Sequence, residues 1–292
     1  GRRPKPSGVY HETLTVDGTR IFNAEYTIDA HRCRVVPAEH EHPPTRFLLL
    51  CGGSFAFGTG VQDDETMAHH IDRLAPEYRV YNLAAMGHGP HQALAIMQHW
   101  DLEDIVREQR GILVYVFIPQ HLPRTLHSMW HATSFGRDDP YFAFNNGDAT
   151  YLGPFRKARP GTALFYALLR REQVWKFLGR DWPPAITEKH IQYVSKHLRA
   201  CLNAFRERLQ GDAFHVLWHP LSPATRSGLG VDTGLVKRIF ERDGLELLDY
   251  EDLFAPDEAG LFFPYDDHPT PEAHRRVAEC FVRDLGIASA AP

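Results

Sequence analysis

Two kinds of hydrophobic pattern divide the chain near residue 46. Residues 10–30 alternate apolar and polar side chains on either side of Asp17-Gly18, a dipeptide typical of tight β-hairpin turns. A polar connector containing prolines follows at residues 37–46. We therefore predict an N-terminal β-hairpin segment and connector over residues 1–46, and a separate folding unit over residues 47–292.

From residue 47 onward, short apolar runs alternate with longer segments of helical periodicity. Runs that are apolar on both faces suit the strands of a parallel sheet covered by helices, and such alternation indicates a doubly wound α/β domain. The predicted strands are residues 47–51, 78–84, 112–118, 214–219 and 245–250, and the predicted helices are residues 65–75, 90–109, 186–210, 230–242 and 271–284.

Residues 119–185 do not follow this alternation. They are rich in Trp, Phe, Pro, His and Asn, and they contain one predicted helix near residues 162–178. We interpret them as an insertion over one end of the sheet that forms a lid or a substrate wall. Five of its aromatic side chains would suit either stacking on sugar rings or packing beneath a loop: Trp130, Phe135, Tyr141, Phe142 and Phe144.

Composition narrows the function classes. The net charge of −5 argues against a nucleic-acid-binding protein, which usually carries a basic face. No stretch approaches the about 20 apolar residues of a membrane span. The chain starts Gly-Arg-Arg-Pro without Met, which fits an extracytoplasmic protein whose leader or anchor has been removed, although no residue assigns the compartment or the oligomeric state.

The four cysteines are too few and too dispersed for a disulfide framework or a zinc motif. Cys51 lies in an apolar run and Cys280 on a helix face, so both are expected to be buried thiols. One bridge among the four remains open.

Residues able to perform acyl transfer follow the predicted strands. Ligands bind beyond the carboxyl ends of the strands in an open parallel sheet, and the segments found there are Gly52-Gly53-Ser54, Asn82 to Gly89, Pro119-Gln120-His121 and Tyr265-Asp266-Asp267-His268. A serine hydroxyl becomes a nucleophile when an imidazole takes its proton. A carboxylate fixes the imidazole tautomer, and backbone N–H groups beside glycines can stabilise the oxyanion.

Each of these features also has a plain structural explanation. A serine after two glycines is most often a turn residue, and His268 could belong to a solvated loop. Thr270-Pro271-Glu272 suits a helix start, with an N-cap, a proline at the first position and an acid in the first turn. That helix start would hold His268 just ahead of a rigid element, and the coincidence of all four segments favours a catalytic site.

At these residues the chain resembles the SGNH (GDSL-like) hydrolase family, over roughly residues 47–285. Gly52-Gly53-Ser54 falls where the family carries Gly-Asp-Ser, Asn82 to Gly87 resembles its second block, and Asp266-Asp267-His268-Pro269 resembles its last block. The resemblance implies a flavodoxin-like parallel sheet of about five strands, a catalytic triad of Ser54, His268 and Asp266, and oxyanion donors on the backbone of Ser54 and Gly87. Ala56 distinguishes the segment from the Gly-x-Ser-x-Gly elbow of α/β-hydrolases.

Three positions depart from the family pattern. Gly53 replaces an Asp. The third block carries no Asn, so Gln120 is the expected substitute because its amide donor is the same on a longer arm, with His121 as the alternative. The family's Asp usually lies three residues before the His, where this chain has Tyr265; a two-residue spacing also occurs, so we expect Asp266, with Asp267 as the alternative.

The predicted function is hydrolysis of short acyl esters, with O-acetyl groups on a carbohydrate as the expected substrate and no metal or cofactor. A polysaccharide O-acetyltransferase with the same triad and a catalytically degenerate carbohydrate-binding scaffold remain alternatives. A metal protein is disfavoured, because His40-Glu41-His42 lies in the connector and His69-His70 are helix neighbours, and neither pair has the i, i+4 spacing of a helical zinc site.

Overall fold

A single parallel sheet organises the computed structural model, which describes residues 6–38, 40–145, 147–171, 181–228, 230–255 and 257–288. Its strands are β3 (Arg46–Gly52), β4 (Tyr78–Asn82), β5 (Arg110–Phe117), β8 (Ala213–Trp218) and β9 (Glu246–Asp249). They are hydrogen-bonded in the order β4-β3-β5-β8-β9, which is the flavodoxin-like order. The predicted doubly wound α/β fold with about five strands is therefore confirmed.

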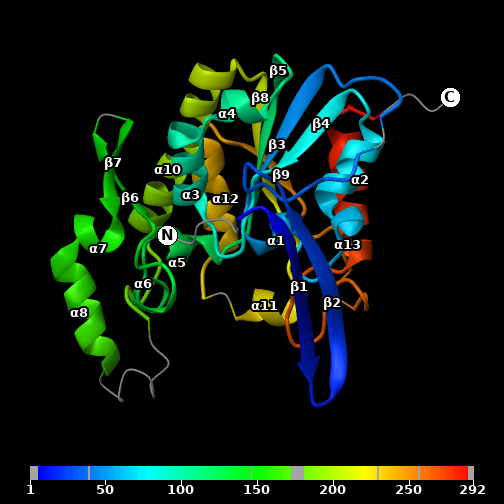
Figure 1. Cartoon of the computed structure of the whole chain (residues 1–292). Coiled ribbons are helices and arrows are strands. Elements are labelled where there is room, and N and C mark those ends of the chain that lie inside the picture. The colour runs from blue at the N-terminus through cyan, green and yellow to red at the C-terminus, as the bar shows by residue number, and fades with distance from the viewer. Residues whose placement is uncertain are drawn as a thin grey trace.

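Helices cover both faces of the sheet (Figure 1). The helices α3 (Pro90–His99), α10 (Glu188–Leu209) and α12 (Thr233–Arg242) lie on one face, and α2 (Met67–Leu74) and α13 (Pro271–Asp284) lie on the other. Alternate residues of β3 enter the two cores: Phe47, Leu49 and Cys51 pack with the first group, and Leu48 and Leu50 with the second. Burial on both faces is the reason that these strands are continuous hydrophobic runs.

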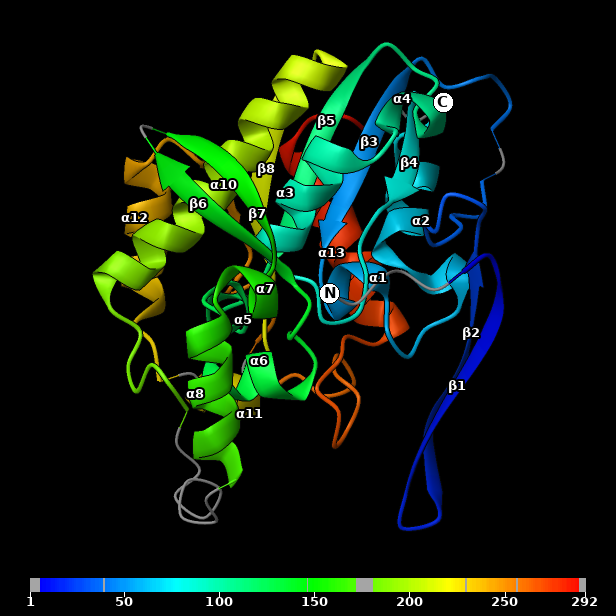
Figure 2. The same cartoon turned by 60° about the vertical axis from the view of Figure 1, so that its left-hand side comes forward.

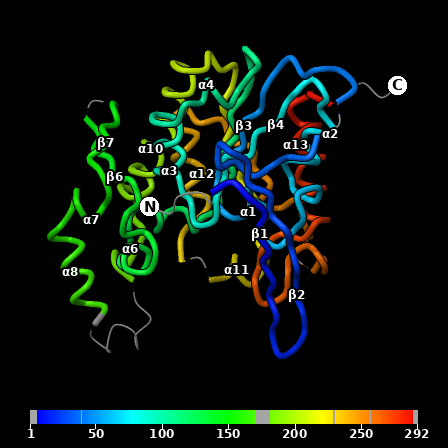
Figure 3. The backbone as a smooth tube through the Cα atoms, viewed as in Figure 1, coloured from blue at the N-terminus to red at the C-terminus, as the bar shows by residue number. Residues whose placement is uncertain are grey.

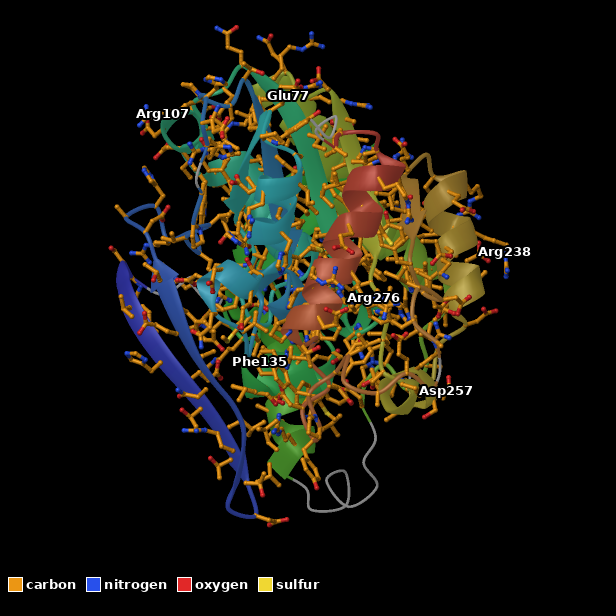
Figure 4. All side chains as sticks on the ribbon, turned by 90° about the vertical axis from the view of Figure 1, so that its right-hand side faces the viewer. Glu77, Arg107, Phe135, Arg238, Asp257 and Arg276 are labelled. Carbon is orange, nitrogen blue, oxygen red and sulfur yellow. The ribbon has the colours of Figure 1, made fainter. Side chains whose placement is uncertain are left out.

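The outer surface of α12 is polar. Val236, Ile239 and Phe240 of α12 are buried, whereas Arg238 of the same helix points away from the sheet (Figure 4). Across the described part of the chain, no helix is long and apolar enough to cross a membrane.

The N-terminal segment forms the predicted hairpin. Strands β1 (Gly8–Val16) and β2 (Thr19–Ile28) pair in antiparallel fashion, and both turn residues, Asp17 and Gly18, have positive φ, as a two-residue hairpin turn requires. The hairpin and the insertion lie on different sides of the sheet (Figures 2 and 3). The boundary at residue 46 remains a prediction.

The insertion contains more regular structure than its sequence predicts. It comprises α5 (His121–Thr125), α6 (Met129–Ser134), the hairpin of β6 (Pro140–Asn145) and β7 (Asp148–Pro154), α7 (Phe155–Ala158) and α8 (Pro160–Arg171). The helix predicted near 162–178 is observed to residue 171, and its remainder lies outside the described residues. The β6–β7 hairpin was not predicted, because its aromatic residues do not alternate cleanly with polar ones.

Two smaller expectations have clear outcomes. The helix predicted over 90–109 is interrupted at Trp100, and the short helix α4 (Leu102–Ile105) follows. The turn between them allows Leu102 and Ile105 to pack into the core beneath the sheet.

All four cysteines are buried and free, so the expectation for Cys51 and Cys280 is confirmed and no bridge forms.

Candidate active site

Ser54 is the first residue of the short helix α1 (Ser54–Phe57), directly after β3. The preceding glycines are sterically required. Gly52 has a φ of +152°, and a Cβ built on it would lie 2.9 Å from the carbonyl oxygen of Val116. The sharp exit from the strand therefore places Ser54 at the carboxyl edge of the sheet, where the sequence predicts it.

Ser54, His268 and Asp266 form a continuous hydrogen-bonded chain. Nε2 of His268 lies 2.8 Å from Oγ of Ser54, and Nδ1 lies 2.5 Å from Oδ2 of Asp266. Because an ionised carboxylate only accepts hydrogen bonds, the imidazole proton belongs on Nδ1. Nε2 then presents its lone pair to the hydroxyl of Ser54, as a general base requires.

Backbone geometry explains why Asp266 and not its neighbour faces the imidazole. Tyr265 and Asp267 both have positive φ, at 67° and 59°, so the loop turns sharply on either side of Asp266. Asp267 N–H donates to the carbonyl oxygen of Phe263, whose own N–H donates to that of His268. These bonds hold the loop closed immediately before α13 begins at Pro271.

Asp267, the alternative acid, points elsewhere. Its carboxylate accepts hydrogen bonds from Oγ of Ser222 at 2.9 Å and Oγ1 of Thr225 at 2.7 Å. Both donors belong to the start of α11 (Pro223–Ser227), where Ser222 is the N-cap. Asp267 therefore anchors a neighbouring loop, and the geometry favours Asp266 as the partner of His268.

Solvent reaches the site. Ser54 is 8% exposed, and the side chains of His268 and Asp266 are 20% and 25% exposed. His268 and Asp266 therefore keep part of their side-chain surface accessible, so water can approach the imidazole.

Two backbone amides are available next to the nucleophile. Ser54 N–H lies at the N-terminus of α1, where helical amides lack an acceptor within the helix. Gly87, with a φ of +80°, lies in the loop between β4 and α3. Neither amide has a hydrogen-bond acceptor in the described part of the chain, which leaves both free to bind a developing oxyanion.

The glycine at position 53 is explained by its surroundings. A Cβ built there would lie 2.7 Å from Nε2 of His121, 3.0 Å from Nη1 of Arg124 and 3.1 Å from the carbonyl oxygen of His88. An aspartate, as in the family motif, would overlap these atoms. The packing of His121 and Arg124 against this position therefore disfavours any side chain larger than that of glycine.

The two candidates for the third oxyanion donor differ in accessibility. Nε2 of His121 is buried without a hydrogen-bond partner, and its other nitrogen, Nδ1, pairs with the hydroxyl of Tyr115 at 3.0 Å. Burial holds the pKa of His121 well below its ordinary value, so the imidazole is neutral and packs behind Gly53. Gln120 precedes α5 and is half-buried, with its Oε1 buried without a hydrogen-bond partner. It is nevertheless the more accessible of the two residues, because His121 is 1% exposed.

An arginine that sequence analysis overlooked holds the nucleophile loop. The guanidinium of Arg34 donates to the carbonyl oxygens of Phe57, Gly58 and Val61 and to Asp63 at 2.9 Å. Arg34 is 2% exposed. The N-terminal segment therefore fixes the loop that follows Ser54, although nothing in the local sequence around Arg34 marks this contact.

A small apolar cluster lies beside the triad. Phe55, Ile118 and Leu221 pack together, and the ring of Phe55 lies 5.4 Å from that of His268. Leu221 also lines a cavity of about 240 Å³ together with Phe254 and Phe262. Phe55, Ile118 and Leu221 are 7%, 2% and 7% exposed, so they form a packed apolar wall beside His268.

Most of the aromatic residues of the insertion are packed inside it. Phe142 is fully buried, and Phe144 and Tyr141 pack against buried clusters. Phe135 is half-buried against His131, with ring centroids 4.7 Å apart. Of the five, Trp130 is exposed, at 56%, so the group does not form a continuous stacking surface for sugars.

One histidine of each pair singled out in the sequence has a protein partner. Nε2 of His40 lies 2.9 Å from Asp72, and Nδ1 of His69 lies 2.7 Å from the carbonyl oxygen of Pro37. A different set, His91, His131 and Asp139, brings three potential metal-ligand atoms together. These residues are far apart in the sequence and form no recognisable motif, so sequence analysis missed them.

No known family model matches the chain, and no curated protein matches it. Among solved structures, it is similar to a member of the lipolytic protein G-D-S-L family from Veillonella parvula DSM 2008, with 12% identity, coverage of 82% of this chain and 98% of that chain, and a TM-score of 0.45. A catalytic mutant of an acetylxylan esterase from Geobacillus stearothermophilus has 12% identity, coverage of 86% and 100%, and a TM-score of 0.45. An alpha/beta hydrolase enzyme from the metagenome of Lake Arreo, Spain, has 12% identity, coverage of 85% and 99%, and a TM-score of 0.45. At this level of similarity the matches assign no activity to this chain.

Proposed function

We propose that this protein is a serine esterase of the SGNH (GDSL-like) type that hydrolyses short acyl esters. The observation that carries the proposal is the hydrogen-bonded chain from Oγ of Ser54 through His268 to Asp266. Its geometry matches the roles of nucleophile, general base and orienting carboxylate, and it lies at the edge of the sheet where α/β proteins bind ligands.

The reaction follows from these contacts. His268 Nε2 takes the proton of Ser54 as Oγ attacks the ester carbonyl, and the carbonyl π electrons move to oxygen. The N–H groups of Ser54 and Gly87 stabilise that oxyanion, and the Gln120 amide is the proposed third donor. Collapse of the intermediate expels the alcohol, which receives the proton from His268. Water activated by His268 then cleaves the acyl-enzyme and regenerates Ser54.

The exposure of the base favours hydrolysis over transfer. A transferase must keep water away from its acyl-enzyme, whereas His268 is 20% exposed. The hydrogen-bonded arrangement of Ser54, His268 and Asp266 also argues against a catalytically degenerate binding scaffold, since a binding protein has no need to hold three such groups within hydrogen-bond distance.

The apolar cluster of Phe55, Ile118 and Leu221 supports a short acyl group. Its members are nearly fully buried, and the ring of Phe55 packs against that of His268, so the cluster forms a wall beside the imidazole that favours an acetyl or similarly short chain. A carbohydrate as the alcohol part of the ester remains the proposed substrate class, with exposed Trp130 as a candidate contact.

Aryl-acetate hydrolysis by the wild-type protein, Ser54→Ala and His268→Ala tests the proposal. We expect turnover by the wild type and background rates for both variants. Acetylated oligosaccharides should then be deacetylated with kcat/KM above that for aryl acetate. Equal rates for the wild type and Ser54→Ala would refute the esterase, whereas aryl-acetate turnover without release from any sugar would refute only the carbohydrate substrate.

A further inference from the structure

Three ligand-type side chains converge between α3 and the insertion. One potential ligand atom from each of His91, His131 and Asp139 lies within 4.8 Å of the other two. Asp139 Oδ2 is 3.3 Å from Nε2 of His91 and 2.7 Å from Nε2 of His131. The three side chains are 0%, 1% and 2% exposed, so this group is separated from solvent.

The charge of Asp139 is not balanced by a permanent cation. Within the described residues, its ion-pair partners are the imidazoles of His91 and His131, and no Lys or Arg is among them. Its second oxygen, Oδ1, is buried without a hydrogen-bond partner. A buried carboxylate is costly unless it is paired or coordinates a metal, so the group has unused capacity for a cation.

The hydrogen bond on the far side of His91 also favours a cation. Oγ1 of Thr125 donates its proton to the carbonyl oxygen of His121 at 2.9 Å, so it can only accept from Nδ1 of His91, 3.4 Å away. With its proton on Nδ1, a neutral His91 presents the lone pair of Nε2 to the Asp139 carboxylate. Two acceptors, Nε2 of His91 and the Asp139 carboxylate, then face each other, and a metal ion between them would remove their repulsion. Metal-binding histidines commonly donate the proton of their other ring nitrogen to a nearby acceptor, as Nδ1 of His91 does here.

The space beside the group is kept clear by a glycine. A Cβ built on Gly136 would lie 2.3 Å from Nε2 of His131 and 3.1 Å from Oδ2 of Asp139. Ligand bonds of about 2.0–2.1 Å in tetrahedral geometry place ligand atoms about 3.3 Å apart. The pair formed by His91 and Asp139 already has this separation, and the pair formed by His131 and Asp139 would need to open by about 0.6 Å.

We propose that His91, His131 and Asp139 bind a divalent first-row transition-metal ion, with Zn²⁺ as the expected metal. Imidazole and carboxylate ligands suit this class of ion. His127 packs against His91, with ring centroids 4.9 Å apart, and its buried Nε2 lacks a partner, so a further nitrogen donor lies next to the group.

The role of the ion is structural. The site is closed to solvent, whereas a catalytic zinc site keeps an open position for water. His91 belongs to α3, His131 to α6, and Asp139 to the turn before β6. A bound ion therefore links the insertion to the helix that follows the Gly87 loop, and it takes no part in the proposed ester chemistry.

Elemental analysis and Zn²⁺ titration of the chain of residues 1–292 test this site. The wild type is compared with Asp139→Asn, which keeps the side-chain shape, and with Gly136→Ala, which removes no ligand. His70→Ala is the matched control, because it removes a half-buried histidine that lies outside the proposed site. Co²⁺ substitution adds a spectroscopic readout, since tetrahedral nitrogen and oxygen ligands give visible absorption bands.

We expect about one Zn²⁺ per chain in the wild type and in His70→Ala. When wild-type protein stripped by a chelator is reloaded with Zn²⁺ at 100 times Kd, its Tm should rise by roughly 5–10 °C. Asp139→Asn and Gly136→Ala should each lose at least tenfold in Zn²⁺ affinity. Chelated wild-type protein that binds Zn²⁺ or Co²⁺ no more tightly than Asp139→Asn, with no rise in Tm, would overturn the proposal and leave a hydrogen-bonded histidine network. Metal retained equally by all variants would also overturn it. Because these readouts do not use ester hydrolysis, their outcome is independent of the proposed function.

Discussion

Asp266 and Asp267 are adjacent carboxylates with opposite assignments, and the same substitution in each separates their roles. Asp266 accepts from Nδ1 of His268, whereas Asp267 accepts from Ser222 and Thr225. Asparagine retains the size of each side chain and removes its charge. It also tolerates the positive φ of position 267, so backbone strain does not distinguish the two variants.

The contacts give the size of the effect for Asp266→Asn. The variant loses the charge-assisted hydrogen bond, worth about 1.5 kcal/mol, and the attraction between the carboxylate and the imidazolium formed in the transition state. That attraction is about 1–4 kcal/mol at about 4 Å between water and a protein surface, a range suited to a pair that is 20% and 25% exposed. The sum of about 2.5–5.5 kcal/mol corresponds to a fall in kcat of roughly 10²- to 10⁴-fold.

Steady-state hydrolysis of an aryl acetate at pH 7.5 is the assay, with urea unfolding as the control for stability. We expect Asp266→Asn to lower kcat with little change in KM, because Asp266 does not touch the substrate. Asp267→Asn should keep kcat within a few-fold and lose about 1 kcal/mol of stability, since one hydroxyl must find a new acceptor. A larger loss of kcat in Asp267→Asn than in Asp266→Asn would refute the assignment.

Three further variants or conditions test the supporting structure. Arg34→Met should lower the free energy of unfolding by about 3–5 kcal/mol, because it removes the donor of three buried carbonyl groups and the ion-pair partner of Asp63, which retains its hydrogen bonds from the N–H of Thr27. A loss below about 1 kcal/mol in urea titrations would show that these contacts of Arg34 are unimportant. Gly53→Ala should lower kcat for aryl acetate at least tenfold, because its methyl would lie 2.7 Å from Nε2 of His121, whereas Gly161→Ala, where a methyl meets nothing within 4 Å, should be unchanged. Burial lowers the pKa of His219 to about 4 and that of His197 to about 3, whereas histidines in the unfolded chain have a pKa near 6.5. Below about pH 6.5 the unfolded chain therefore binds more protons than the folded one, so the free energy of unfolding should fall by roughly 2 kcal/mol per histidine from pH 7 to 5. A free energy of unfolding that is constant over this range would contradict this expectation.

The sheet could be predicted because its strands are buried on both faces. FLLLC at 47–51 and ILVYVFI at 112–118 leave no polar face, which only a sandwiched parallel strand requires. Strand ends then placed Ser54, Gly87 and His268 at one edge, and the structure brings Ser54 and His268 within hydrogen-bond distance. This placement needed no knowledge of side-chain contacts.

Other features depend on contacts between distant segments and could not be predicted. Whether Asp266 or Asp267 faces the imidazole depends on the positive φ of Tyr265 and Asp267, which cannot be predicted from a tyrosine and an aspartate at these positions. The grouping of His91 with His131 and Asp139 depends on how the insertion folds back onto α3. The β6–β7 hairpin of that insertion was missed because its pairing is made within an aromatic-rich segment that lacks clean alternation.

The central claim is that Ser54 is an activated nucleophile. A fluorophosphonate probe forms a covalent adduct with such a serine, and peptide mass spectrometry identifies the labelled residue. We predict stoichiometric labelling of Ser54 in the native protein, none in Ser54→Ala, strong slowing in His268→Ala, and unchanged labelling in Ser222→Ala, which removes a nearby hydroxyl that binds Asp267 instead of His268. Labelling that is absent, that falls on another residue, or that persists at the same rate in His268→Ala would contradict the account.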